Sequence, residues 1–171
     1  MKILLTYSSR TGNTEKVARA IREVLPASAD FYKMSEAPQP EEYDVVIVGF
    51  WIDRGMPDKE ALSYIDTIKN KRVAFFFTLG ARPDSAHGQK CFERTRSLLK
   101  DNLLLGEFAC QGKIDPKLIE SFKSLPPEHP HAITEGSLER YAAAAIHPDD
   151  TDLLRAGETF LNIFLQVNGE K

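Results

Sequence analysis

The fold of this chain is decided by Ser8-Ser9-Arg10-Thr11-Gly12-Asn13-Thr14. This segment lies between an apolar run, Ile3 to Tyr7, and a helix-like stretch that begins near Asn13. The first N–H groups of a helix have no partner inside it, and the helix dipole adds partial positive charge there. Hydroxyl and amide side chains add further donors, and Gly12 lets a ligand approach closely. The segment therefore predicts a phosphate site; the alternative is an ordinary turn before a helix.

The composition is that of an ordinary globular domain. The chain has 171 residues, of which 42% are apolar and 27% charged, and this length favours one domain, residues 1–171. The net charge of −3 argues against nucleic-acid binding. No apolar run approaches the ~20 residues that span a membrane, and no leader of signal type is evident. Cys91 and Cys110 lack metal-site or redox spacing, so we expect core thiols in a cytoplasmic protein.

Apolar runs alternate with amphipathic stretches along most of the chain. This alternation predicts an α/β fold in which helices cover both faces of a five-stranded parallel sheet. The expected strands are residues 3–7, 30–34, 45–49, 73–78 and 108–113. The expected helical faces lie within residues 17–25, 61–68, 91–99 and 153–167.

Residues 115–148 interrupt the alternation. They contain five prolines and a helical pattern from Leu138 to Ile146, which is too apolar for a free linker. We predict a helical insertion between the last strand and the last helix. Asp149 and Asp150 are expected to cap that last helix.

The first loop resembles the phosphate loop of flavodoxins, which bind flavin mononucleotide (FMN). The family pattern is Ser/Thr-x-Thr-Gly-Asn-Thr, and Ser9 to Thr14 match it without a mismatch. The resemblance covers roughly Met1 to Lys113 and the last helix. It implies a three-layer α/β/α sandwich with strand order 2-1-3-4-5 and non-covalently bound FMN. Ligands of such sheets bind where the strand order reverses, a rule that flavodoxin itself exemplifies.

The resemblance also assigns roles to the second loop, residues 50–56. Flavodoxins usually place an aromatic residue here against the flavin ring, and Trp51 or Phe50 matches that role. Gly55 is the candidate for presenting backbone groups to the ring. The alternative for both aromatic residues is a place at the edge of the core.

The third loop, residues 78–88, departs from the family. Many flavodoxins place a tyrosine here over the flavin, and this loop has none. One face of the ring is then either open or covered by His87, Arg82 or the insertion; for both side chains the alternative is a solvated loop. From the three loops together, the predicted FMN-binding residues are Ser8, Ser9, Arg10, Thr11, Gly12, Asn13, Thr14, Phe50, Trp51, Ile52, Arg54, Gly55, Thr78, Leu79, Gly80, Ala81, Arg82 and His87.

The sequence leaves the role of one arginine open and gives no metal site to a pair of histidines. The charge of Arg10 either strengthens phosphate binding or serves a partner. His129 and His131 lack Cys or acidic partners at ligand spacing, so no metal site is predicted. No catalytic acid, base or nucleophile stands out.

The family implies electron transfer, in which the cofactor supplies the redox chemistry. The first hypothesis is an electron carrier that docks on larger redox enzymes, although a net charge of −3 is modest for one. The second is a small reductase that passes electrons from a nicotinamide to a quinone-like or other conjugated substrate. The third is a binding module that has lost flavin. We expect a monomer or homodimer that contacts neither nucleic acid nor membrane.

Overall fold

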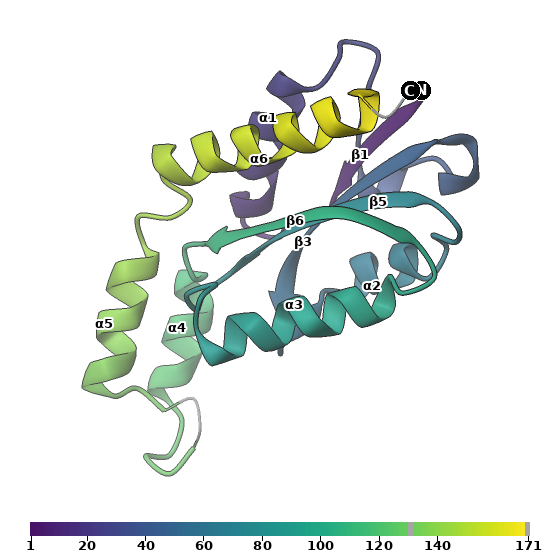
Figure 1. Ribbon diagram of the computed structural model, residues 1–171. Helices are drawn as coiled ribbons and strands as arrows, with labels where there is room; N and C mark the ends of the chain where they lie inside the picture. Colours follow the sequence, from purple (N-terminus) through teal and green to yellow (C-terminus); the bar gives the residue numbers. More distant parts are fainter. Residues whose placement is uncertain (130–131, 170–171) are drawn as a thin grey trace.

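The computed structural model describes residues 1–129 and 132–169, and its centre is one twisted sheet (Figure 1). Its parallel strands are β1 (Ile3–Tyr7), β2 (Asp30–Lys33), β3 (Val45–Asp53), β5 (Arg72–Leu79) and β6 (Leu103–Gln111). Their order is β2-β1-β3-β5-β6. Counted without the two-residue strand β4 (Met56–Pro57), which pairs antiparallel with the end of β3, this is the predicted order 2-1-3-4-5. The flavodoxin-like fold is thus confirmed.

Helices cover both faces of the sheet (Figure 1). One face carries α1 (Asn13–Val24) and α6 (Asp150–Gly169), and the other carries α2 (Lys59–Ile65) and α3 (Ala86–Leu98). Two short 3-10 helices, η1 (Met34–Glu36) and η2 (Pro40–Glu42), follow β2. Among the described residues, no helix has the length and apolar character required to cross a membrane.

The central strands are continuous apolar runs because both of their faces are covered. Alternate residues of β5 therefore enter opposite cores. Phe75 and Phe77 join the core under α2 and α3, whereas Phe76 packs edge-on against Phe160 of α6 with ring centroids 5.8 Å apart. Gly49 makes room for Phe76, since a Cβ there would lie 2.0 Å from the ring.

Two predicted boundaries were wrong. Strand β3 does not end at Gly49 but continues to Asp53, where the chain turns back through Arg54 and Gly55 with positive φ angles of 50° and 79°. Strand β6 covers residues 103–111 and not 108–113, because Gly106 and Glu107 interrupt the apolar run between Leu105 and Phe108 in this half-buried edge strand.

The predicted insertion forms α4 (Pro116–Lys123) and α5 (Glu135–Ala144), between β6 and α6. Both helices extend beyond the carboxyl end of β6 (Figure 1). Asp149 caps α6 as predicted: its carboxylate accepts the N–H of Asp152 at 2.9 Å. Asp150 is instead the first residue of the helix.

Cys91 and Cys110 are free thiols buried in the two cores, as predicted. Burial raises the pKa of both thiols, so both are poor nucleophiles near neutral pH.

Candidate functional site

A cavity of about 350 Å³, here called the loop cavity, lies at the carboxyl ends of β1, β3 and β5. It brings together ten residues of the three predicted loops: Arg10, Thr11, Asn13, Thr14, Trp51, Ile52, Thr78, Leu79, Gly80 and Ala81. The remaining wall comes from the chain after β6 and from the insertion: Gly112, Lys113, Ile114, Asp115, Leu118, Phe122, Arg140 and Tyr141. The point of strand-order reversal thus carries a site of the size typical for small ligands, about 300–1,000 Å³.

The first loop is folded so that backbone donors are left for a ligand. The hydroxyl of Ser9 accepts the N–H groups of Gly12 and Glu15 at 3.2 and 3.3 Å, which bends the loop back onto itself. Gly12 permits this bend with a φ of +88°. Within residues 1–129 and 132–169, the backbone N–H groups of Asn13 and Thr14 donate no hydrogen bond. This is the arrangement that an anion at a helix N-terminus requires.

Side chains of the first loop fix it to its neighbours. The buried hydroxyls of Thr14 and Thr78 are hydrogen-bonded at 2.9 Å, which joins the first loop to the end of β5. The amide of Asn13 donates to the carbonyl of Lys113 at 2.9 Å and to the hydroxyl of Thr11 at 3.1 Å. Asn13 therefore braces the loop through its side chain and offers a ligand its backbone N–H.

Ser8 was predicted to bind the cofactor, but its side chain does not line the loop cavity. Its side chain is buried, and its hydroxyl donates to the carboxylate of Asp58, which also accepts the N–H groups of Glu60 and Ala61 as the cap of α2. Ser8 therefore ties β1 to α2. Ser9 also lies off the loop cavity, in an adjoining groove, and shapes the loop from behind.

Trp51 forms an aromatic wall of the loop cavity, and its contact with a flavin ring stays a prediction. The guanidinium carbon of Arg10 lies 5.6 Å from the centroid of the Trp51 ring, and Nη2 of Arg10 lies 3.7 Å from the carboxylate of Asp115. Arg10 thus links the first loop, β3 and the start of the insertion. Both proposed roles for this arginine stay predictions.

Phe50 does not contribute to the site. It is fully buried and stacks on Phe75 and Phe77, with ring centroids 6.2 and 5.8 Å away. Successive residues of a strand point to opposite sides, so Phe50 enters the core and Trp51 does not.

Gly12, which bends the first loop, and four further predicted residues also lie off the lining of the loop cavity. The carbonyl of Gly55 accepts a hydrogen bond from Arg94 of α3 at 2.9 Å, so the Arg54-Gly55 turn packs towards α3. His87 lies 3.8 Å from the sulfur of Cys91. The guanidinium of Arg82 is exposed and binds the carboxylate of Asp84. The third loop thus lines the loop cavity with the uncharged residues 78–81, whereas the side chains of Arg82 and His87 lie outside the cavity.

Sequence analysis did not predict the eight lining residues that follow β6. They reach the loop cavity because the chain after β6 packs closely against the first and third loops. A Cβ on Gly80 would lie 2.8 Å from Ile114, and one on Gly112 would lie 2.8 Å from the amide of Asn13. These contacts bring the chain after β6 against the first and third loops. The one available signal was the apolar pattern of the insertion.

The charges of the loop cavity favour an anion. Arg10, Lys113 and Arg140 line it together with one carboxylate, Asp115, although the whole chain has a net charge of −3. A phosphate near the N-terminus of α1 would therefore lie in a locally positive region.

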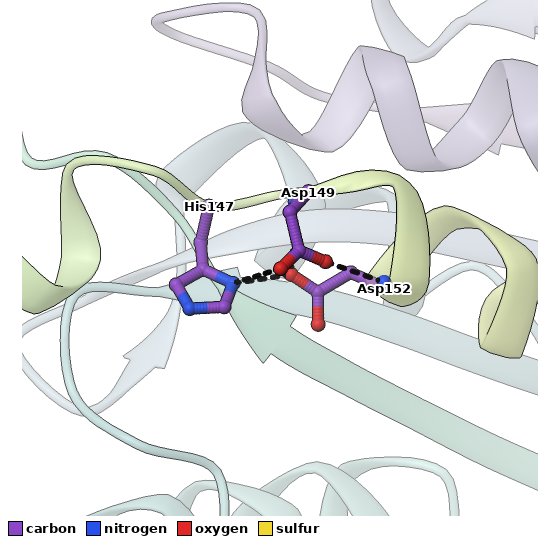
Figure 2. Close-up of side chains that lie close together, drawn as sticks. All are labelled: His147, Asp149 and Asp152. Atoms are coloured by element: carbon purple, nitrogen blue, oxygen red, sulfur yellow. Dashed lines mark hydrogen bonds and ion pairs between the residues drawn. The ribbon is translucent and has the colours of Figure 1, made fainter.

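A second polar cluster marks the end of the insertion. His147, Asp149 and Asp152 bring three potential metal-ligating atoms within 4.8 Å of one another, the one such group among residues 1–129 and 132–169 (Figure 2). Nδ1 of His147 lies 2.5 Å from the Asp152 carboxylate, which also accepts the N–H of Asp149 at 3.0 Å. These bonds form the start of α6, which gives the cluster a structural role. Sequence analysis did not predict this cluster, and His131, which it considered and set aside as a metal ligand, lies outside the described residues.

A doubly wound sheet, a glycine-containing phosphate loop and an aromatic wall at the strand-order reversal define a flavin-nucleotide type of site. The comparison with known families agrees: residues 4–161 match the flavodoxin domain. The chain belongs to the flavodoxin domain family.

Individual proteins resemble the chain over its length. The flavodoxin-like domain-containing protein BilS of Clostridioides difficile (strain CD3) is 33% identical over 176 residues, covering 98% of this chain and 99% of that protein. Oxidised flavodoxin 2 from Bacillus cereus superposes with a TM-score of 0.56 at 21% identity, covering 97% of this chain and 99% of that one. A Lactobacillus acidophilus flavoprotein solved in complex with FMN superposes with a TM-score of 0.52 at 15% identity, covering 64% of this chain and 92% of that one. Family membership supports FMN as the cofactor, and the residues of the loop cavity fit it.

Proposed function

We propose that the protein binds FMN in the loop cavity and carries electrons between partner redox proteins. The observation that supports this most strongly is the first loop, whose free N–H groups at Asn13 and Thr14 meet a cavity bounded by Trp51. When bound, FMN supplies one- or two-electron redox chemistry.

The residues of the chain then hold and orient the cofactor. The backbone N–H groups of Asn13 and Thr14 and the hydroxyl of Thr11 bind the phosphate, and the charge of Arg10 adds to that attraction. Trp51 offers the flavin ring an aromatic surface. Lys113 and Arg140 keep the cavity positive, which favours negative charge that develops on the cofactor.

The volume of the cavity favours the carrier over the reductase. About 350 Å³ is near the lower end for small-ligand sites, and residues of the insertion form part of the lining. A reductase that accepts hydride needs a second planar ring against the flavin. An electron carrier requires only that a docked redox protein come close to the flavin. A small cavity therefore suits electron transfer to a docked protein.

We also infer that these partners are cytoplasmic. Both cysteines are free and buried, which suits a compartment that keeps thiols reduced.

The test is an anaerobic reduction of the FMN-loaded protein. We expect a yellow protein that added NADH or NADPH alone does not bleach and that bleaches when a separate flavodoxin reductase is added. Rapid bleaching by the nicotinamide alone would contradict the carrier and support the reductase. A colourless protein that takes up no FMN would contradict both.

A further inference from the structure

The insertion contributes an apolar helix residue and two aromatic residues to the lining of the loop cavity. Leu118 and Phe122 of α4 and Tyr141 of α5 line the cavity. Helix α4 has no buried residue, and Leu118 is 39% exposed. Apolar side chains that face a cavity and stay exposed gain free energy when a ligand with an apolar surface covers them.

The insertion is tied to the domain mainly at its two ends. Arg10 pairs with Asp115 at the first end, and the N–H of Lys113 donates to the carbonyl of His147 at 2.8 Å at the second. Between these ends, the buried residues of the described chain are few and small: Ala132, Ser137 and Ala144. A segment with so few buried contacts opens at a low cost in free energy.

The third loop leaves one face of the ring site without an aromatic residue of its own. Its candidates turn elsewhere, since Arg82 pairs with Asp84 in solvent and His87 packs against Cys91. Phe122 and Tyr141 are the aromatic side chains of the described residues that line the cavity besides Trp51.

We propose that helices α4 and α5 form a cap on the flavin ring, in which Tyr141 supplies the second aromatic wall and the cap is ordered by the ring itself. This inference rests on FMN binding as proposed above. The phosphate is held by the first loop, whereas the cap responds to the ring. An anion that lacks the ring therefore leaves the cap as it is.

The first test is FMN affinity, measured by the quenching of flavin fluorescence. Loss of one aromatic contact reduces affinity about three- to tenfold, so Tyr141→Leu should raise the Kd by that factor and reduce the quenching at saturation. Tyr141→Phe keeps the ring and should match the wild type. Leu138→Ala is the matched control, because Leu138 is exposed on the same helix and does not line the cavity.

The second test is hydrogen exchange of residues 116–144 with FMN or with inorganic phosphate. We expect FMN to slow exchange in α4 and α5, and phosphate to leave it unchanged. Equal exchange with and without FMN, or a Tyr141→Leu variant with wild-type Kd and quenching, overturns the cap while FMN binding stands. A wild-type protein that binds no FMN overturns the proposed function and the cap with it.

Discussion

The two walls of the loop cavity are built in different ways. The first loop, residues 8–14, is joined to the core through Ser8 and Asp58, and through the buried pair Thr14–Thr78. The insertion, residues 115–148, also places side chains in the lining but buries few residues of its own. The first loop is therefore packed into the α/β/α sandwich, whereas the insertion lies at its edge with few buried residues.

This difference separates two functions of the site. The wall formed by the first loop fixes donors for a phosphate, so it determines which class of cofactor binds. In our proposal, the insertion covers the flavin ring and contributes charges around it, and these features would set access and redox potential. Mutations in the first wall should therefore reduce stability or cofactor affinity strongly, whereas mutations in the second should act locally and more weakly.

The largest effect is expected from Thr14→Val. It leaves the hydroxyl of Thr78 buried without its partner, which costs about 1–3 kcal/mol of unfolding free energy. Urea unfolding of the apoprotein measures this loss. The double variant Thr14→Val/Thr78→Val removes both hydroxyls and should regain part of the stability; strictly additive losses would show that the two side chains do not interact.

Asn13→Ala should weaken FMN binding by about 1–2 kcal/mol, because it removes two hydrogen bonds that shape the first loop. A fluorescence titration with FMN measures the affinity. Asn168→Ala is the control, since Asn168 makes a comparable side-chain bond on α6 away from the cavity. If both variants bind FMN equally well, Asn13 does not brace the site.

Asp149→Ala should cost about 1 kcal/mol, the usual loss for a helix N-cap. The insertion joins α6 at this point, so hydrogen exchange should increase in residues 135–152 more than in β3 or β5. Equal increases throughout the chain would contradict the view that the insertion is attached mainly at its ends.

The smallest effect is expected from Arg140→Gln, whose side chain is exposed and therefore screened by solvent. We expect FMN affinity to fall less than about fivefold at low salt, and the difference to vanish near 1 M salt, where the screening length is about 3 Å. Arg155→Gln on α6 is the matched control. A salt-independent difference would indicate a packing role for Arg140 instead of a charge.

The sequence was sufficient where local chemistry and periodicity agree. The runs 45–48 and 73–78 are continuously apolar because they are central strands, and the first loop carries its own motif. The alternation of a strand would also have separated Phe50 from Trp51, had β3 been extended past Gly49. That extension was missed because Arg54-Gly55 is an unusual sequence for a two-residue turn, in which asparagine or aspartate usually precedes the glycine.

The remaining part of the site depends on tertiary contacts. The helical pattern of Leu138 to Ile146 indicates that the insertion packs against the domain, but it does not show that Arg140 and Tyr141 reach the cavity, because α5 is mostly exposed. Its placement follows from the joints at Asp115 and His147, which involve residues distant in the sequence.

The most direct test of the central claim compares FMN with riboflavin, which shares the ring and lacks the phosphate. Both are titrated into the apoprotein under identical conditions, with flavin fluorescence as the signal. The site predicts that FMN binds with one-to-one stoichiometry and at least tenfold more tightly than riboflavin, because only FMN reaches the free N–H groups of the first loop. Equal affinities, or no binding of FMN, would contradict the assignment of Ser9 to Thr14 as a phosphate loop.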